Sequence, residues 1–563
     1  MNTKTAVLIP PTRGAVLDDA HVGDIRGALG TIARDDLAPR RRVSGRVKTL
    51  LAILGPGLIV MVGDNDAGAF GTYTQAGQNY GTSLLWTMLL LVPVLYVNQE
   101  MVVRLGAVTG VGHARLILER FGRFWGAFSV IDLFLLNALT IVTEFIGIAL
   151  ACRYLGLPKL PTVILAAVLI VAAASTGSFR RFERLCLVLV AGSLVLIPIY
   201  LLIHPPAAQM VHDFVVPGLP HGAKLSDVML LIIGIVGTTV APWQLFFQQS
   251  YIVDKRITPR FIGYEKADLW IGIGIVVLGA AAMIGFSAAT FTGHPEFGQF
   301  TDAAGTAAGL GRYVSHTAGV LFAIALIDAS VIGAAAVGLA TAYATSDVLS
   351  INHSLHRPIT QAKGFYACYA GLIAIAAALV LAPGVPLGTL TTGVQTLAGV
   401  LLPSATVFLL LLCNDRAVLG PWVNTLKTNV FTSIVVWILV LLSVILTASV
   451  VFPEIGGRMI LAILAGGILL GAAAGAYLLV GYHRYRQTAL AERMLSVPRG
   501  GQPAFPAWER ERAARATWRM PALELLARPV LSTQRKVGLI TLRAYLALAV
   551  ILVVAKLVII SLG

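Results

Sequence analysis

The run Gly55-Pro-Gly-Leu-Ile-Val-Met-Val-Gly-Asp-Asn-Asp-Ala-Gly-Ala-Phe-Gly-Thr72 begins as an apolar helix and then places Asp64, Asn65 and Asp66 between glycines. A carboxylate near the centre of a bilayer costs roughly 2.5–3.5 kcal/mol, so two of them need a cavity, a cation or a proton. Successive residues of an α-helix point about 100° apart, so one ligand meets all three side chains only if the backbone unwinds. Gly63 permits that unwinding. The stretch therefore predicts a broken membrane helix with a polar site at the break.

The composition of the whole chain is that of a polytopic membrane protein. Of its 563 residues 57% are hydrophobic and 12% charged, with a mean hydropathy of +0.83, whereas soluble domains carry about 25% charged residues. The net charge is +15, and the Lys and Arg residues lie in the loops between apolar segments. This placement indicates that the basic loops contact anionic lipid headgroups and not nucleic acid. The four cysteines have no paired spacing, so neither a disulfide framework nor a zinc site is expected.

Thirteen segments are long and apolar enough to cross a bilayer. They lie near 48–71, 82–106, 124–153, 159–176, 183–203, 226–250, 268–292, 315–349, 364–383, 388–413, 428–452, 459–482 and 538–562. Loops after even-numbered segments are rich in Lys and Arg, which places the N-terminus in the cytoplasm and the chain in the cytoplasmic (inner) membrane.

The first ten segments form the predicted transporter core, residues 48–413. They divide into halves of five, 48–203 and 226–413, each opening with a broken helix, and an odd number of spans inverts the second half. The sequence predicts an all-α protein with about 12–13 transmembrane helices in this arrangement. The flanking parts are predicted as a basic, disordered cytoplasmic tail (1–47), two further helices (428–482), a basic cytoplasmic segment (483–537) and a possible thirteenth helix (538–563).

A second interruption, Gly234-Ile-Val-Gly-Thr-Thr-Val-Ala-Pro-Trp-Gln244, opens the second half. Pro242 removes one helix donor and frees carbonyl groups of the preceding turn. One interpretation is a proline kink whose polar groups are satisfied locally. The other is a cavity wall that offers Thr238 and Gln244 to a ligand held by Asp66. Paired broken helices in corresponding halves are typical of a transporter's binding site.

The carboxylates of the first break also allow two interpretations. Asp64 and Asp66 could cap helix fragments. Alternatively, they are hard oxygen ligands for magnesium, manganese or calcium, with Asn65 nearby and the carbonyl group of Gly63 completing the shell.

Other polar groups lie on apolar helices of the core. Asn137, Thr140 and Glu144 form one stripe in the third segment, and Gln395 lies in the tenth. Such a stripe faces the bundle interior, as a structural hydrogen-bond network or as an ion or proton pathway. Since no Walker A, nucleophile-elbow or His-Glu-x-x-His motif occurs, neither an enzyme nor a cofactor is expected.

Several motifs, in this order and spacing, resemble the NRAMP family of divalent-metal transporters over roughly residues 48–480. They are Gly55-Pro-Gly, the break at Asp66, Gln75-x-Gly77-x-x-Tyr80-Gly81, Arg104-Leu-Gly-x-x-Thr109-Gly110, Glu144-x-Ile-Gly147, Phe182-Glu183, Val240-x-Pro242 and Asn414-Asp415. The resemblance implies a LeuT-type fold, a divalent metal cation bound as substrate between the first and sixth helices, and transport by alternating access.

Departures from the family pattern change the expected substrate. The family's Asp-Pro-Gly-Asn motif aligns with residues 66–69, so Asp66 is kept and Ala69 replaces the Asn. The family's Met-Pro-His motif aligns with residues 241–243, so Ala241 replaces the Met and Trp243 replaces the His. Loss of the soft thioether weakens selection for transition metals. The chain is thus closest in character to the divergent NRAMP-related magnesium transporters. We expect import of hydrated magnesium and/or manganese through a site lined by Ala69, Ala241 and Trp243. Ile141 replaces an Asp that the family has in the third helix. The loss of this acid disfavours proton coupling.

Two other functions fit the same sequence. An amino-acid or organic-cation transporter of this fold would use Trp243 as an aromatic wall for its substrate. A non-transporting membrane sensor would instead use the basic segment 483–537 to bind a partner.

Overall fold

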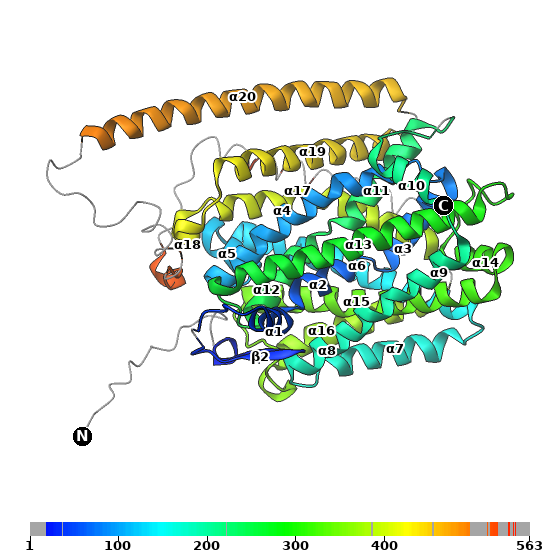
Figure 1. The fold of residues 1–563 in the computed structure, drawn as a ribbon, viewed down its shortest axis with the longest axis horizontal. Coiled ribbons are helices and arrows are strands. Elements are labelled where there is room, and N and C mark those ends of the chain that lie inside the picture. Colours follow the sequence, from blue (N-terminus) through cyan, green and yellow to red (C-terminus); the bar gives the residue numbers. More distant parts are fainter. Residues whose placement is uncertain are drawn as a thin grey trace.

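The computed structural model describes residues 19–36, 38–220, 222–383, 387–452 and 455–495, with a few residues between 515 and 547. The molecule is a bundle of long, roughly parallel helices (Figure 1). Within the described residues, ten helices are long and apolar enough to cross a membrane, or eleven if one bent pair counts as a span. Helices suit this setting because they satisfy every backbone polar group internally.

The first half of the bundle follows the first five predicted segments. Its helices are α2 (Pro56–Val62), α3 (Ala67–Tyr80), α4 (Trp86–Thr109), α5 (His113–Phe121), α6 (Arg123–Tyr154), α7 (Lys159–Ala174), α8 (Phe179–Gly192), the 3-10 turn η2 (Ser193–Val195) and α9 (Leu196–Ile203). A short helix, α10 (Ala207–Val215), leads to the second half.

The second half repeats the pattern. Its elements are α11 (Leu225–Thr239), α12 (Pro242–Asp254), η3 (Pro259–Phe261), α13 (Ile262–Phe291), α14 (Ala303–Tyr313), α15 (His316–Leu349), η4 (Ile359–Gln361), α16 (Lys363–Leu381) and α17 (Leu387–Cys413). Helix α13 packs along both pieces of the first broken helix, α2 and α3, while α4 packs along both pieces of the second, α11 and α12. This reciprocity is what an internal repeat produces.

Two long helices, α6 and α15, form the centre of the core (Figure 1). They approach closely at glycines. A side chain at Gly147 of α6 would meet Ala67 at 2.6 Å, and one at Gly333 of α15 would meet Glu144 at 2.9 Å. Small residues let the backbones of membrane helices come together, and here they bring α3, α6 and α15 to one point.

Helices outside the ten-helix core lie along one edge. They are α18 (Arg416–Leu419), η5 (Gly420–Trp422), α19 (Leu426–Val451) and α20 (Gly457–Leu495), with η6 (Leu523–Leu525) further on. Figure 1 shows α20 beyond α19 at the top of the view. Every predicted segment from 48 to 482 overlaps one or more helices, and the first, 48–71, overlaps three: α1, α2 and α3. Most of the predicted thirteenth helix, 538–563, and most of the predicted segment 483–537 lie outside the described residues.

The prediction of a disordered N-terminal tail is wrong for residues 19–36. This part forms the turn η1 (Asp19–His21) and an antiparallel hairpin of β1 (Ile25–Gly27) and β2 (Gly30–Ile32), followed by helix α1 (Val43–Ile53). Arg180 and Arg184 of α8 donate to backbone carbonyls of the hairpin. A two-stranded hairpin is marginal alone, so these contacts to the bundle are what order it.

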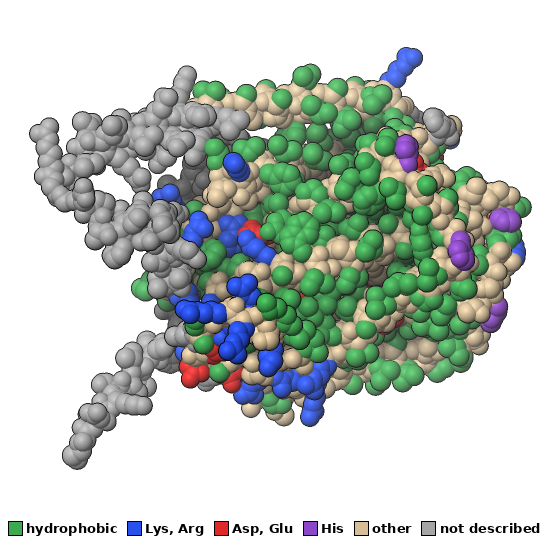
Figure 2. Space-filling model, viewed as in Figure 1, with side chains coloured by type: hydrophobic (Ala, Val, Ile, Leu, Met, Phe, Trp, Pro, Cys, Tyr) green, Lys and Arg blue, Asp and Glu red, His purple; other side chains and the backbone are tan. Residues whose placement is uncertain are grey.

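Charge separates the two ends of the bundle. Figure 2 shows Lys and Arg gathered at the end that carries α1 and the hairpin, and His side chains at the other. We call the first the basic end; it includes Arg180, Arg184, Lys255, Arg256 and Arg260. The opposite end carries α10 and α14.

Candidate functional site

Both predicted interruptions are breaks in the structure. Helix α2 ends at Val62 and α3 begins at Ala67. Asp66 caps α3, because its Oδ1 accepts a hydrogen bond from the amide N–H of Ala69 at 2.9 Å. Helix α11 ends at Thr239 and α12 begins at Pro242, a favourable first position for proline because no helical partner awaits its missing N–H.

A side-chain hydrogen bond connects the two broken helices. The amide nitrogen of Gln244 donates to Oδ1 of Asp64 and, at 3.3 Å, to the carbonyl oxygen of Thr239. Gln99 of α4 donates in turn to Gln244 Oε1 at 3.1 Å. The second oxygen of Asp64, Oδ2, is buried and has no hydrogen-bond partner among the described residues. One side of this carboxylate is thus left for a ligand.

Asp66 lies on the other side of the break, beside Glu144 of α6. Oε2 of Glu144 accepts a hydrogen bond from the Ala67 N–H at 3.1 Å. A side chain at Gly333 would lie 2.9 Å from the Glu144 carboxyl group and 3.0 Å from Cβ of Asp66. The carboxyl groups of Asp66 and Glu144 are therefore neighbours, and Gly333 leaves the room they occupy. Cap and ligand are compatible roles for Asp66, since capping uses one of its two oxygens.

The other predicted wall residues surround these carboxylates. Thr238 is buried, and its hydroxyl has no partner among the described residues. The Trp243 ring lies 3.7 Å from where a Cβ on Gly63 would be. Ala69 and Ala241 are buried at the starts of α3 and α12. On the α17 side, the Gln395 amide lies against Gly68, where any larger residue would collide with it.

Three predicted residues point elsewhere. The Asn65 amide donates to the Val276 carbonyl oxygen of α13 at 3.3 Å. Asn137 donates to Thr341 of α15 at 2.8 Å, and Thr140 to the Leu136 carbonyl oxygen of its own helix at 3.0 Å. In this structure the lower part of the α6 stripe is a helix-packing network, and only Glu144 reaches the break.

Two cavities flank the breaks from opposite ends. One leads from Asp302 and Phe300 near α14 to Ala67, next to Asp66. The other lies in the basic half, between α5, α6, α12 and α17, and reaches Pro242, next to Ala241. Asp64, Asp66, Glu144 and Gln244 are all at most 3% exposed. The polar centre is therefore closed to solvent, with a hollow on each side.

The donors at the centre are hard. They are carboxylate, amide and hydroxyl groups, and no group of three His, Cys, Asp or Glu side chains within the described residues forms a metal cluster by itself. A bound cation would complete its shell with water or carbonyl oxygens, as magnesium commonly does. Sequence reasoning missed Gln99 and Gly333. Gln99 lies in the run Asn98-Gln99-Glu100 within an apolar segment, a signal that could have revealed it, whereas Gly333 could be recognised only from the packing.

A buried polar centre between two broken helices in an inverted-repeat bundle is typical of a membrane transporter. The sequence model described as Natural resistance-associated macrophage protein-like, Nramp, matches residues 57–449. The chain belongs to the Nramp family of integral membrane transporters, and the predicted LeuT-type fold is confirmed.

Relatives agree with the family assignment, and a solved structure agrees with the fold. The chain is 31% identical to the divalent metal cation transporter MntH of Ralstonia nicotianae over 417 residues, covering 70% of this chain and 88% of that one. It is 25% identical to MntH of Aeromonas hydrophila over 429 residues, covering 72% and 97%. The crystal structure of the Eremococcus coleocola manganese transporter superposes with a TM-score of 0.59 at 21% identity, covering 81% of this chain and all of that one.

Proposed function

We propose that this protein transports hard divalent cations, manganese and/or magnesium, across the cytoplasmic membrane by alternating access. The observation that carries the proposal is the position of Asp64 and Asp66, two buried carboxylates at the α2–α3 break, of which Asp64 contacts Gln244 of the second broken helix. Relatives named divalent metal cation transporters support the substrate class.

The donor set argues for a hard, partly hydrated ion. Asp66 supplies the main charge, Asp64 Oδ2 and Thr238 Oγ1 are buried oxygens without described partners, and Gln244 orients Asp64. Ala69 and Ala241 are small and offer no side-chain donor of their own. Because magnesium keeps several waters and takes only one or two carboxylates, this arrangement favours oxygen-preferring ions over soft transition metals.

The flanking cavities support alternating access. In the proposed cycle the ion enters past Asp302 and Ala67, is held at the break, and leaves past Pro242 toward the basic end. The Lys and Arg residues at that end support a cytoplasmic N-terminus. With this orientation, the direction of the proposed cycle is import. Proton coupling is not part of the proposal. Acidification of vesicles that depends on metal transport would contradict that part.

The test is ion flux into proteoliposomes with an ion-sensitive dye inside. Asp66→Ala should abolish manganese and magnesium uptake, because it removes the main charge of the site. Asp328→Asn is the matched control, since Asp328 is an intramembrane carboxylate of α15 that lies against Gly192 of α8 and not at the break. Unchanged uptake by Asp66→Ala would refute the proposal.

One observation favours a second candidate function. The Trp243 ring is only 1% exposed and reaches the break at Gly63, and an aromatic face there could attract an organic cation. Thermal unfolding of the purified protein with divalent metals and with amino acids distinguishes the two, since a ligand stabilises the state it binds. Stabilisation by amino acids alone would favour the second function.

A further inference from the structure

A cavity separate from the transport site lies on the side of the bundle near the basic end, between α4, α13 and the loop before α19. Its volume is about 430 Å³, within the range of ligand pockets. Its lining includes Tyr96, Glu100, Arg104, Lys266, Trp422 and Arg515. We call it the Arg104 pocket.

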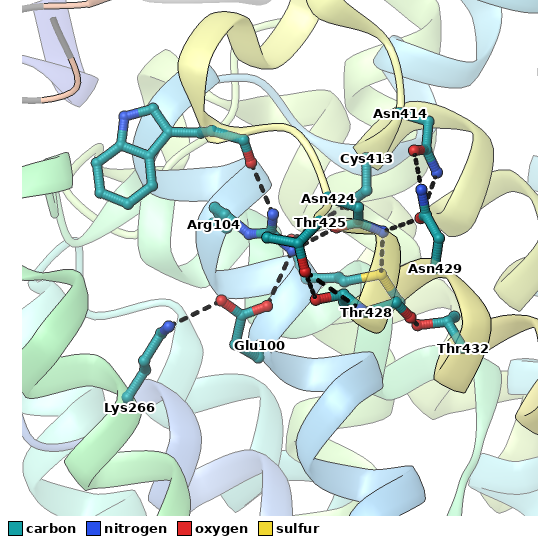
Figure 3. Close-up of polar contacts among 12 residues, drawn as sticks. Glu100, Arg104, Lys266, Cys413, Asn414, Asn424, Thr425, Thr428, Asn429 and Thr432 are labelled. Carbon is teal, nitrogen blue, oxygen red and sulfur yellow. Dashed lines mark hydrogen bonds and ion pairs between the residues drawn. The ribbon is translucent and has the colours of Figure 1, made fainter. Parts of the chain in front are cut away.

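The Arg104 pocket has more positive than negative groups. Arg104 donates to the Trp422 carbonyl oxygen at 2.6 Å, to Asn424 at 2.7 Å and to Glu100 at 2.9 Å (Figure 3). The other oxygen of Glu100 pairs with Lys266 at 2.9 Å. Glu100 therefore serves two cations, while the guanidinium of Arg515 adds a third positive group over the Trp422 ring. No second acid is among the described lining residues.

One donor of the lining residue Arg104 remains unused. Arg104 is 7% exposed, and its Nε has no hydrogen-bond partner among the described residues. Buried charged donors are normally paired, because an unmatched one costs free energy. Thr425, which caps α19, and Thr428 in the first turn of that helix line the same cavity and add hydroxyl groups.

The surroundings of the pocket are those of a lipid headgroup. Lys266 lies in the second turn of α13, and Arg104 lies about one turn before the end of α4, so both are near the basic end of the bundle. One turn of α13 further on, Trp270 is 48% exposed and stacks on Tyr96, with 4.7 Å between the ring centroids. Phe431 of α19 is 37% exposed on the same rim. Positive groups below an aromatic rim are typical of the membrane interface.

We propose that the Arg104 pocket binds the phosphate group of an anionic phospholipid, whose acyl chains lie along the exposed apolar sides of α13 and α19. Basic pockets between membrane helices recognise anionic headgroups through charge. Lys266 and Arg104 bind the phosphate, and Glu100 positions both. The site links α4 and α13 of the core to α19 outside it, so the lipid connects the two parts.

The test uses the full-length protein in neutral detergent, with thermal unfolding followed against phosphatidylglycerol, phosphatidylcholine or inorganic phosphate. Phosphatidylglycerol alone should raise the midpoint. In Lys266→Gln, the concentration for half of that shift should rise about fivefold, the effect of one cation at an anionic lipid. Lys266→Arg should retain the wild-type value. Arg181→Gln, which removes an exposed charge at the same end, is the matched control.

Each other outcome contradicts the lipid site. Equal shifts with phosphatidylcholine would show that charge is irrelevant, and a shift with inorganic phosphate would assign the pocket to a soluble anion. Equal effects of Lys266→Gln and Arg181→Gln would reduce the binding to general attraction by the basic end. Native mass spectrometry provides a second readout that does not depend on stability: the wild type should retain phosphatidylglycerol, and Lys266→Gln should retain less.

Discussion

The Gln244 amide donates to the Asp64 carboxylate, and this bond connects α12 of the second broken helix to the break of the first, 180 positions away in the chain. Both side chains are fully buried. In the proposed cycle, ion binding at Asp64 therefore acts on α12 through this bond, and a movement of α12 acts on Asp64. This is the coupling that alternating access requires between an ion and a helix.

Gln244→Leu tests that coupling. The substitution leaves Asp64 without its side-chain donor, which costs roughly 1–3 kcal/mol because a buried charge loses a partner. We expect a lower unfolding midpoint without metal, a larger stabilisation by saturating manganese than in the wild type, and slower flux. Gln248→Leu is the matched control, because the Gln248 amide, one turn further along α12, has no partner among the described residues. Equal effects of the two variants would show that Asp64 does not depend on Gln244.

Two substitutions of Glu144 distinguish a structural role of this side chain from a role in transport. In Glu144→Gln the new amide oxygen can still accept from the Ala67 N–H, so the unfolding midpoint and metal flux should both be largely retained. Glu144→Leu leaves that N–H unsatisfied and should destabilise the protein by roughly 1–3 kcal/mol. Thermal unfolding and flux measured on the same preparations check this. A stable Glu144→Gln protein without flux would instead make Glu144 an ion ligand or a proton carrier.

Much of the fold is predictable because a membrane span is a one-dimensional signal. Apolar length alone located every segment from 48 to 482, and the cost of Asp64 and Asp66 in hydrocarbon located the first break. The direction of each side chain at the break was not predictable. Asn65 and Asp64 are adjacent, yet one bonds to Val276 of α13 and the other to Gln244 of α12. That choice depends on the path of four unwound residues, which no local pattern encodes.

The N-terminal hairpin escaped prediction for a related reason. Its strands have three residues each, too few for a pattern, and its order comes from contacts far along the chain. Glu183, known from the sequence only as part of the Phe182-Glu183 motif, is completely buried and accepts from the hairpin's Ala28 N–H at 2.6 Å. Only the assembled bundle shows why an acid stands there.

The buried pair of Glu183 and Lys255 should stabilise the basic end strongly. Their 2.7 Å contact has both side chains at 0% exposure, and Lys255 also donates to the Ile53 and Leu54 carbonyl oxygens. Lys255→Met leaves the carboxylate without its cation and should destabilise the protein by about 3–5 kcal/mol. The double variant Glu183→Gln/Lys255→Met should recover part of that loss, which thermal unfolding measures. A double variant as unstable as the sum of the single ones would show that the two side chains act independently.

His353, in the loop after α15, should make stability depend on pH. Burial alone would lower the pKa of His353, but the Asp347 carboxylate 3.3 Å away, the Ile351 carbonyl group and Asp254 together outweigh burial and raise the pKa to about 9. A histidine with a raised pKa stabilises the fold fully below its unfolded value near 6.5, and this contribution is lost as the pH rises through about 9. The free energy of unfolding should therefore fall by at most about 3 kcal/mol between these values. Unfolding midpoints from pH 6 to 9.5 should decline less steeply in His353→Gln, whereas the exposed-residue control His316→Gln should follow the wild type. Parallel pH profiles of His353→Gln and the wild type would show that His353 is not the titrating group.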